Sequence, residues 1–455
     1  MNAGRFRVAC LALADVACVA CVWAVVVKVY HALALDQADV SYYLTFWPVL
    51  VVFVLINLFA RLYHGRAWAP GMPLPEVEEF RRLVLSAFAT HLLLMAFLGF
   101  AHGQDQVSRA VVILSGLLCA CAAQPFRYLM RYALARTGLG QIPAFLVGEG
   151  AVAEQVKARL ARSSYCGFRI VRAFGKDDFR RVIAEGRARG VRHLFACYPD
   201  DRYFRTRFAE LSDAFTFVEY LPTSDAFPVS GAQVIQVGGL GGLEMTNQRK
   251  FHSLLLEKSL LDRALAAVIF VCALPFFVVM PILIKLTSPG PVLYKAKRLG
   301  KKGRTIYVWK FRSMYADADR RLQSMLDADP ALRAEFERDF KLKNDPRVTP
   351  LGRFMRKTSI DELPQLFNVF THDMALIGPR PIVEKEVPRY GRAYEIFSSV
   401  KPGITGLWQA SGRSDTDYAE RVALDVHYIL NWSPWMDLWI VFRTAAAVLK
   451  MKGSY

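Results

Sequence analysis

The stretch KTSIDELPQLFNVFTHDMALIGPRP (357–381) says most about how this chain folds and about its chemistry. It holds an adjacent acid pair, Asp361 and Glu362, and it ends in a Gly-Pro-Arg-Pro turn that two prolines make rigid. Arg356 precedes the pair and Arg380 lies in the turn. Carboxylates can act as nucleophiles or metal ligands, and guanidiniums bind phosphate oxygens in bidentate fashion. The segment therefore predicts chemistry on a phosphate group.

The acid pair is expected at the start of a helix. Ser359 and Glu362 fit the capping-box pattern, but a cap at Ser359 puts Pro364 past the first turn, where a backbone donor is needed. A cap at Asp361 puts Pro364 within the first turn, where proline costs little. We therefore place both acids at a helix N-terminus, whose dipole favours anions. A capping role alone is the alternative for Asp361.

Nearby cations complete the predicted site. Lys310 and Arg312 follow the strand-like segment TIYVW (305–309), and we take both as phosphate- or substrate-binding residues, together with Arg356 and Arg380. Positive charge at this density is expected to keep a neighbouring carboxylate ionised and therefore nucleophilic.

A magnesium ion is the expected cofactor. Glu362 is the predicted ligand, with Asp361 beside it, because Mg²⁺ prefers carboxylates combined with substrate phosphates.

The front of the chain is built for a membrane. Four apolar runs each approach the ~20 residues needed to span a bilayer; they cover roughly 9–28, 43–60, 83–101 and 109–126. Arginines precede the first run and follow the second and fourth, whereas the first loop carries Asp36 and Asp39. The positive-inside rule then puts the N-terminus and everything after residue 127 in the cytoplasm. Lys28 and the length of the first run indicate an anchor rather than a cleaved signal.

Composition agrees with a membrane protein. Of the 455 residues, 54% are hydrophobic, and the net charge of +18 suits anionic lipid or phosphate substrates. The chain has no zinc-finger or RNA-binding signature, so we expect no nucleic-acid partner. The eight cysteines form no disulfide framework, and Cys18-x-x-Cys21 lies in an apolar span, where small buried hydrophobes are expected.

The middle of the chain, 141–247, alternates strand-like and helix-like segments and predicts a Rossmann-like α/β domain. The segment GEGAVA (148–153) fits G-x-G-x-x-A and allows a dinucleotide site. No acid clearly ends the second strand, with Asp177 only a loose candidate, so a tight turn without ligand is the alternative. Gly238–Gly242 predicts a flexible link to the last domain.

A fifth apolar segment, 260–287, is long enough to span but is not expected to cross. Six basic residues follow it within 295–304, and exporting them would oppose the positive-inside bias. Pro275 and Pro281 predict a bend, so a hairpin that enters and leaves by the cytoplasmic leaflet fits both observations. A proline-kinked spanning helix is the alternative.

From about residue 252 to its end, the chain closely resembles the bacterial sugar transferases, which are polyprenyl-phosphate sugar-1-phosphate transferases of the monotopic phosphoglycosyl transferase type. The front and middle resemble the large members of that family. The motifs that carry the resemblance are IKLTSPGPVLY (284–294), KRLGKKGRTIYVWKFRSM (297–314), NDPRVTPLGRFMRKTSIDELPQLFNV (344–369), GPRP (378–381) and PGITGLWQASGR (402–413).

The resemblance implies a mechanism and partners. Asp361 matches the family's nucleophile, which attacks a UDP-sugar, releases UMP and carries a covalent phosphosugar to undecaprenyl phosphate. Glu362 matches the acid tied to Mg²⁺, and Lys310, Arg356 and Arg380 match phosphate-binding cations. The protein would act at the cytoplasmic face of a bacterial inner membrane, starting exopolysaccharide, capsule or O-antigen assembly. The oligomeric state is left open, with a homodimer as one option.

Local departures from the family leave the proposed catalytic groups in place. The usual Ser-Pro break of the hairpin is Leu274-Pro275 here, the pair that opens it is Lys258-Ser259, and His372–Ala375 replaces Gly-Asp-Met-Ser.

The sequence thus predicts three parts: a four-helix transmembrane bundle (1–136), a Rossmann-like α/β domain (141–247) and an α/β catalytic domain on a re-entrant membrane hairpin (252–455). The rival hypotheses are a membrane-anchored NAD-dependent nucleotide-sugar dehydratase or epimerase, and a non-enzymatic scaffold for polysaccharide assembly.

Overall fold

The computed structural model divides into two compact units, Met1–Phe227 and Pro228–Tyr455, which are described separately. It describes residues 3–33, 46–64, 74–100, 108–148, 150–162, 167–175, 177–197, 210–221, 232–237, 240–245, 252–315, 317–328, 333, 345–411 and 418–449. The loop acids Asp36 and Asp39, part of the glycine-rich link and the last two residues of the 402–413 motif lie outside these ranges. The boundary between the two units falls after Phe227, inside the predicted α/β domain (141–247), so the predicted domain limits stay predictions.

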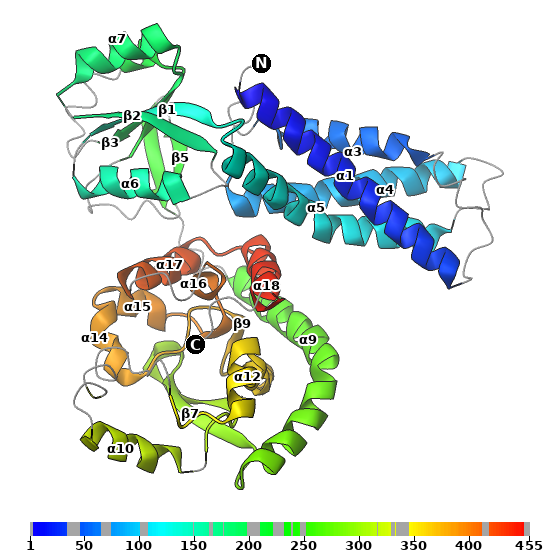
Figure 1. Ribbon diagram of the computed structural model, residues 1–455, viewed down its shortest axis with the longest axis vertical. Coiled ribbons are helices and arrows are strands. Elements are labelled where there is room, and N and C mark those ends of the chain that lie inside the picture. The colour runs from blue at the N-terminus through cyan, green and yellow to red at the C-terminus, as the bar shows by residue number, and fades with distance from the viewer. Residues whose placement is uncertain are drawn as a thin grey trace. The chain divides into compact units, whose positions relative to one another are not determined.

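Four apolar helices pack side by side in the first unit (Figure 1). They are α1 (Ala3–Ala32), α3 (Pro48–Phe59), α4 (Glu76–Phe100) and α5 (Arg109–Thr137). By length and composition α1, α4 and α5 can each cross a membrane. The second predicted span is shorter than expected, since α3 has 12 residues and begins at Pro48, which is suited to the first position of a helix.

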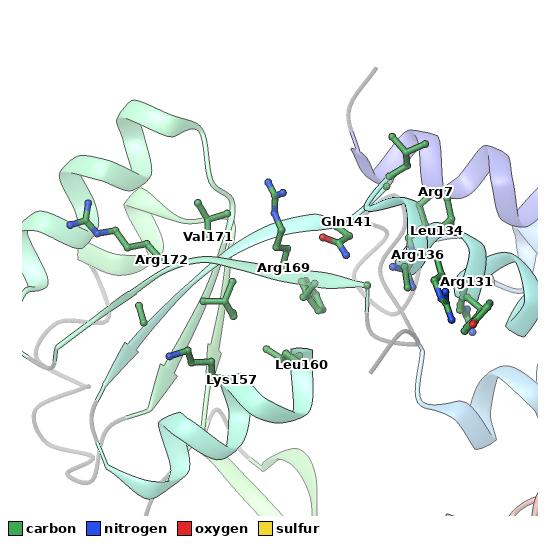
Figure 2. Close-up of a pocket in the computed structure, with 18 residues that line it drawn as sticks. Arg7, Arg131, Leu134, Arg136, Gln141, Lys157, Leu160, Arg169, Val171 and Arg172 are labelled. Carbon is green, nitrogen blue, oxygen red and sulfur yellow. The ribbon is translucent and has the colours of Figure 1, made fainter. Parts of the chain in front are cut away.

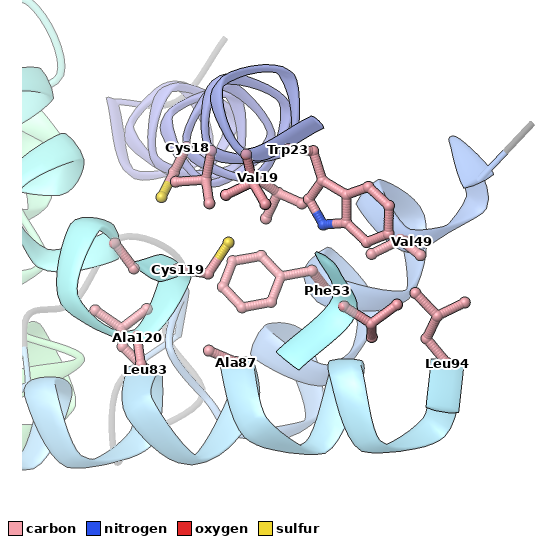
Figure 3. Close-up of a cluster of buried hydrophobic side chains, with 14 of the residues drawn as sticks. Cys18, Val19, Trp23, Val49, Phe53, Leu83, Ala87, Leu94, Cys119 and Ala120 are labelled. Atoms are coloured by element: carbon pink, nitrogen blue, oxygen red, sulfur yellow. The ribbon is translucent and has the colours of Figure 1, made fainter. Parts of the chain in front are cut away.

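A cluster of apolar side chains fills part of the bundle core, beside buried polar residues such as Asn57, Thr90 and His91. Figure 3 shows Trp23, Phe53 and their neighbours filling the space between the helices. Cys18 and Cys119 lie in that core, whereas Cys21 points outward. All seven described cysteines are free, so the prediction that Cys18 is a small core residue is confirmed.

A buried ionic network crosses the bundle. The guanidinium of Arg127 donates to both carboxylate oxygens of Asp15, at 2.8 and 2.6 Å, and to Glu79 at 2.8 Å. Arg131 donates to both oxygens of Glu79, and the Tyr63 hydroxyl donates to Asp15. All four charged side chains are buried, and two positive charges balance two negative ones. From the sequence, Arg127 and Arg131 were only flanking charges; the structure places them in the core.

The second half of the first unit is a parallel sheet in the order β2-β1-β3-β4, which confirms the predicted α/β region. The elements are β1 (Ile142–Gly148), α6 (Ala151–Arg162), β2 (Phe168–Phe174), α7 (Phe179–Arg189), β3 (His193–Cys197) and β4 (Phe217–Tyr220). Helices α6 and α7 cover opposite faces (Figure 1), and alternate β1 residues face each helix. This order is the flavodoxin-type arrangement rather than the dinucleotide-binding one, so the Rossmann-like assignment is not confirmed.

The first glycine of the predicted dinucleotide motif has a packing role. Gly148 has φ +134°, and a Cβ there would lie 2.1 Å from the carbonyl oxygen of Cys197 on β3. Glycine is therefore required for the close approach of two strands. The close packing accounts for Gly148 without a ligand, and Asp177 is an exposed turn residue.

The second unit begins with a hairpin, β5 (Ala232–Val237) and β6 (Leu240–Met245), followed by the 36-residue helix α9 (His252–Thr287). Helix α9 runs without a break through Pro275 and Pro281, and Figure 1 shows it curving around the rest of the unit. Curvature at prolines follows from the lost hydrogen bonds. The predicted return through one leaflet stays a prediction.

Aromatic contacts and an ion pair fix α9 to the C-terminal elements. Phe270 contacts the rings of Phe367 and Phe370, and Phe277 contacts Phe311. Lys258 Nζ lies 2.9 Å from the buried Asp437 carboxylate. The outer face of α9 stays apolar and exposed, as a membrane-inserted helix requires.

The other elements of the second unit form a compact α/β body. They are the hairpin β7 (Leu293–Leu299) and β8 (Thr305–Phe311) with η3 (Lys301–Gly303) between them, α10 (Ala318–Ala328), α12 (Pro350–Thr358), η4 (Ile360–Gln365), α13 (Leu366–Phe370), β9 (Ala375–Ile377), η5 (Glu384–Glu386), α14 (Val387–Tyr390), α15 (Ala393–Ser398), β10 (Gly403–Thr405), α16 (Leu407–Ala410), α17 (Tyr418–Leu430) and α18 (Pro434–Leu449).

Replacing Arg127 with leucine should destabilise the helix bundle by about 3–5 kcal/mol, because Asp15 and Glu79 would lose a buried counter-charge. Arg81→Leu is the matched control: Arg81 pairs with Glu78 at the surface, where ion pairs contribute ~1 kcal/mol or less. Denaturant unfolding of the purified full-length protein in detergent measures both. Equal stability of the two variants would show that the buried network does not hold the bundle together.

Candidate functional site

The acid pair lies in the first turn of η4, immediately after α12. Ser359 separates the two helices with φ 59°, a left-handed conformation that redirects the chain. The cap position belongs to Ser359, whose side chain makes no capping bond, so the prediction that Asp361 caps the helix is wrong. The segment forms a 3₁₀ helix that includes Pro364. Asp361 is thereby free of a capping role.

Helix α12 is positioned by its own N-terminal residues. The Thr349 hydroxyl accepts a bond from the backbone N–H of Gly352 at 2.9 Å, and Pro350 occupies the first helical position. A Cβ on Gly352 would lie 1.9 Å from the carbonyl oxygen of Ser313, so only glycine lets the helix approach this loop. Arg356, one turn further on, donates from Nε to Ser313 Oγ at 2.9 Å. This bond fixes the Arg356 side chain, whose guanidinium interacts electrostatically with Asp361.

A buried asparagine fixes the acid-bearing segment to strand β8. Asn368 accepts from the backbone N–H of Trp309 at 3.0 Å and donates to the carbonyl of Tyr307 at 2.8 Å. Next to these residues, Lys310 Nζ lies 2.8 Å from Glu362 Oε1. The structure therefore brings Lys310 to the acid pair, as the sequence predicted.

Asp361 is buried and lies close to a second negative charge. Its side chain keeps 8% of its exposure, and burial together with the charge of Glu362 raises the pKa of its carboxyl to about 6. Lys310 and Arg356 pull the pKa down but do not outweigh these two causes. The group remains mostly ionised at neutral pH, although the surroundings as a whole raise its pKa rather than lower it. A carboxylate that is ionised yet poorly solvated is a strong nucleophile.

The two carboxylates fit a magnesium ion that also contacts substrate. Among the described residues no group of three or more histidines, cysteines or acids could hold a metal alone. Mg²⁺ commonly uses one or two carboxylates and takes its remaining ligands from phosphates and water. The repulsion between Asp361 and Glu362 would be relieved by such a cation. The donor set therefore suits Mg²⁺ in the presence of a phosphate substrate.

The Gly-Pro-Arg-Pro turn is clamped backbone to backbone. Gly378 N–H donates to the carbonyl of Thr405 at 2.8 Å, and Gly403 N–H donates to that of Pro379 at 2.9 Å. A Cβ on Gly403 would lie 2.1 Å from Gly378 N, and one on Gly406 would lie 2.1 Å from the Gly378 oxygen. These contacts explain the glycines of the PGITG segment. They hold the backbone of the turn, and with it the base of the Arg380 side chain.

Arg380 shares its surroundings with an arginine that the sequence analysis missed. Both Arg380 and Arg421 stack on Trp408, with guanidinium carbons 5.6 and 4.9 Å from the ring centre. Burial lowers the pKa of Arg380, Glu362 raises it, and Arg421 lowers it, so all three groups interact. Arg421 on α17 is buried and bonds Glu386 through Nη1, at 3.2 Å.

Two nitrogen atoms of the Arg421 guanidinium have no hydrogen-bond partner among the described residues. They are Nε and Nη2, and both are buried. Two guanidiniums that stack on the same ring, one of them with unpartnered donors, are suited to binding an anion. Arg421 precedes Asp425 by four residues, a spacing that is common for ion pairs on the surface of a helix. The sequence therefore provided no reason to assign Arg421 to the site.

Arg312 is engaged elsewhere. Its Nη2 donates to the carbonyl of Ser288 at 2.5 Å and its Nη1 to that of Pro289 at 2.9 Å. These bonds secure the turn that follows α9, and they use both terminal nitrogens. The buried Nε of this side chain has no hydrogen-bond partner among the described residues, and the predicted phosphate-binding role of Arg312 stays a prediction.

Comparisons with known proteins agree with this site. The bacterial sugar transferase family model matches residues 253–451. The undecaprenyl-phosphate galactose phosphotransferase of Salmonella typhimurium is 33% identical, over 96% of this chain and 93% of that protein. The UDP-galactose-lipid carrier transferase of Erwinia amylovora is 33% identical, over 77% of each chain.

A third relative is named for another sugar. The UDP-glucose:undecaprenyl-phosphate glucose-1-phosphate transferase of Escherichia coli is 34% identical, over 54% of this chain and 52% of that protein. The match with the Salmonella protein extends over both compact units, and the family match contains every residue of the site. The chain belongs to the bacterial sugar transferase family.

Proposed function

We propose that this protein transfers a sugar-1-phosphate from a UDP-sugar to undecaprenyl phosphate, the lipid carrier on which bacterial polysaccharides are started. The observation that carries the proposal is the buried Asp361 beside Glu362, with Lys310, Arg356 and Arg380 around it. The names of its relatives support the donor and acceptor classes. They differ in the sugar, so we assign a hexose without choosing between galactose and glucose.

In the first step a carboxylate oxygen of Asp361 attacks the β-phosphorus of the UDP-sugar. A new phosphorus–oxygen bond forms, the bond to the UMP oxygen breaks, and UMP leaves with the electron pair. The product is an aspartyl phosphosugar. Burial of Asp361 supports this role, because a poorly solvated carboxylate gives up little hydration when it attacks.

The cations have separate tasks in this proposal. Arg356 and Lys310 flank Asp361 and would stabilise charge on the transferred phosphate. Arg380 and Arg421 would bind the diphosphate oxygens further out, and Trp408 supports both guanidiniums. Mg²⁺, held by Asp361 and Glu362, would neutralise the negative charge that the diphosphate brings to the acid pair.

In the second step a phosphate oxygen of undecaprenyl phosphate attacks the phosphorus of the intermediate and displaces the Asp361 carboxylate. The apolar outer face of α9 supports a lipid acceptor. The end of α9 and Val292 line an apolar recess of about 390 Å³ with a single cation, Lys285. The opposite face of this helix end packs against Ile360, next to the nucleophile. The lipid would thus reach Asp361 along α9.

We also propose that the protein is a multi-pass membrane protein with its active site on the cytoplasmic face. The four long apolar helices support membrane insertion. The exposed basic hairpin of β7 and β8 suits an anionic inner leaflet, where each Lys or Arg contributes ~1 kcal/mol. UDP-sugars are cytoplasmic metabolites, so the donor and the basic surface would meet on the same side.

Asp361→Asn should lower UMP release from a UDP-sugar by about three orders of magnitude or more, because the amide cannot form the intermediate. Asp373→Asn, an exposed acid in the following loop, is the control and should keep full activity. The assay uses purified protein, undecaprenyl phosphate and Mg²⁺, and scores UMP for UDP-galactose and UDP-glucose. Wild-type turnover by the Asp361 variant would end the nucleophile assignment.

The rate should fall as the pH drops through about 6, because protonation of Asp361 removes the nucleophile. Glu362→Gln should lower the overall rate but move this acid limb to lower pH, since the like charge that raises the Asp361 pKa is gone. Glu384→Gln, at an exposed position, should leave the limb unchanged. A limb at the same pH in both variants would mean that another group controls the acid side of the profile.

Arg421→Met should raise the KM for the UDP-sugar about ten-fold or more with a smaller change in kcat, because it removes charged donors from the diphosphate. Arg389→Met is the matched control: this exposed arginine stacks on Tyr418 at the surface. Initial rates over a range of UDP-sugar concentrations separate the two parameters. An unchanged KM in a folded Arg421 variant would restrict Arg421 to holding Glu386.

A further inference from the structure

A basic cavity of about 700 Å³ lies within the first unit, between the ends of the membrane helices and the edge of the parallel sheet. Helices α1 and α5 contribute Arg7, Arg131 and Arg136, and the α/β half contributes residues of α6 and β2. Figure 2 shows these three arginines gathered at the helix ends, with Arg169 on β2 and Lys157 on α6. The catalytic residues all belong to the other unit.

The charge of this cavity is one-sided. Six lining residues are basic and none of the described lining residues is acidic. Some of the cations have partners outside the cavity: Arg131 binds Glu79, Arg172 binds Glu185, and Lys157 lies 3.7 Å from Glu154. Arg172 also points away from the others in Figure 2. The excess positive charge therefore rests mainly on Arg136 and Arg169.

Arg136 and Arg169 carry that excess. Arg136 stacks on Tyr132, with its guanidinium carbon 5.1 Å from the ring centre, and Arg169 is exposed on the edge strand. Neither makes an ion pair with a described residue. Guanidiniums placed in this way are available to an incoming anion, and phosphate matches their geometry.

The junction that forms the cavity is tightly packed. Arg7 is buried, and its guanidinium lies against the backbone where β2 begins, so that a Cβ on Gly167 would overlap it. Gly167 also accepts a bond from the N–H of Ile142 on β1. The cavity is thus bounded by fixed elements rather than by loose side chains.

The cavity lies at headgroup depth if α5 spans the membrane. A helix of 29 residues is about 43 Å long, against a hydrocarbon core of ~30 Å, so its last turns extend beyond the core. Leu139, which lines the cavity, is an exposed apolar residue suited to acyl chains. Basic pockets at the ends of membrane helices bind anionic headgroups.

We propose that this cavity binds a phosphate group, and that the phosphate belongs to the headgroup of an anionic membrane lipid. The site would tie the α/β half of the first unit to the bilayer surface. Its residues belong to the first unit and none of them takes part in the proposed reaction, so the proposal does not depend on that reaction.

Full-length protein in nanodiscs of phosphatidylcholine, with or without phosphatidylglycerol, tests the proposal. Native mass spectrometry counts retained phosphatidylglycerol, and thermal unfolding reports stabilisation. Arg136→Gln/Arg169→Gln should lower the affinity for phosphatidylglycerol about ten-fold or more and remove its stabilising effect. Arg180→Gln/Arg192→Gln removes two exposed charges of the same domain outside the cavity and should behave like wild type. Arg169→Gln alone serves if the double variant does not fold.

Inorganic phosphate, UMP and UDP are added separately to distinguish a soluble source. These anions can also bind the catalytic site, which is the same in all variants. The informative quantity is therefore the difference in ligand affinity between wild type and the cavity variant. A difference with these anions but not with phosphatidylglycerol would support the phosphate site and overturn the lipid assignment. Identical behaviour of wild type and cavity variants toward every ligand would overturn the proposal.

Discussion

Burying one carboxylate beside another is the constraint on which the catalytic unit depends. Two adjacent acids in a poorly solvated turn repel each other, and the raised pKa of Asp361 records that cost. The unit offsets it with Lys310, which pairs with Glu362, and with Arg356, whose charge lowers the pKa of Asp361. The same imbalance leaves the pair suited to a cation and to a phosphate substrate. In the proposed mechanism this strained pair is where a poorly solvated anion would attack the phosphate, so stability would be given up at the site that needs it.

Much of the family's sequence pattern serves to hold this arrangement rather than to react. Asn368 bonds the backbone of β8, Gly352 allows α12 to approach Ser313, and Gly403 and Gly406 clamp the turn that carries Arg380. Each of these contacts fixes backbone, so the charged side chains start from rigid positions. Preorganised charge is the largest contribution that a protein can make to phosphoryl transfer.

The first unit handles buried charge by full neutralisation. Arg127 and Arg131 meet Asp15 and Glu79 with short bidentate bonds inside an apolar bundle, which leaves little capacity to bind anything else. At the nearby cavity positive charge is in excess, since none of the described lining residues is acidic and neither Arg136 nor Arg169 makes an ion pair with a described residue. Arg127 and Arg131 thus hold helices together, whereas Arg136 on α5 and Arg169 on β2 line the cavity for which a phosphate ligand is proposed.

The sequence by itself determined the membrane front, the alternating α/β region, the acid pair and most of its cations, because apolar periodicity and short motifs act over a few residues. It also identified the family. Only the tertiary structure decided which arginines meet the acids: Arg312 bonds carbonyls after α9, whereas Arg421, some sixty residues from Asp361 along the chain, stacks on Trp408 beside Arg380. It also turned Arg127 from a flanking charge into a core residue. Such pairings depend on contacts between distant elements and on burial, and neither leaves a local signal in the chain.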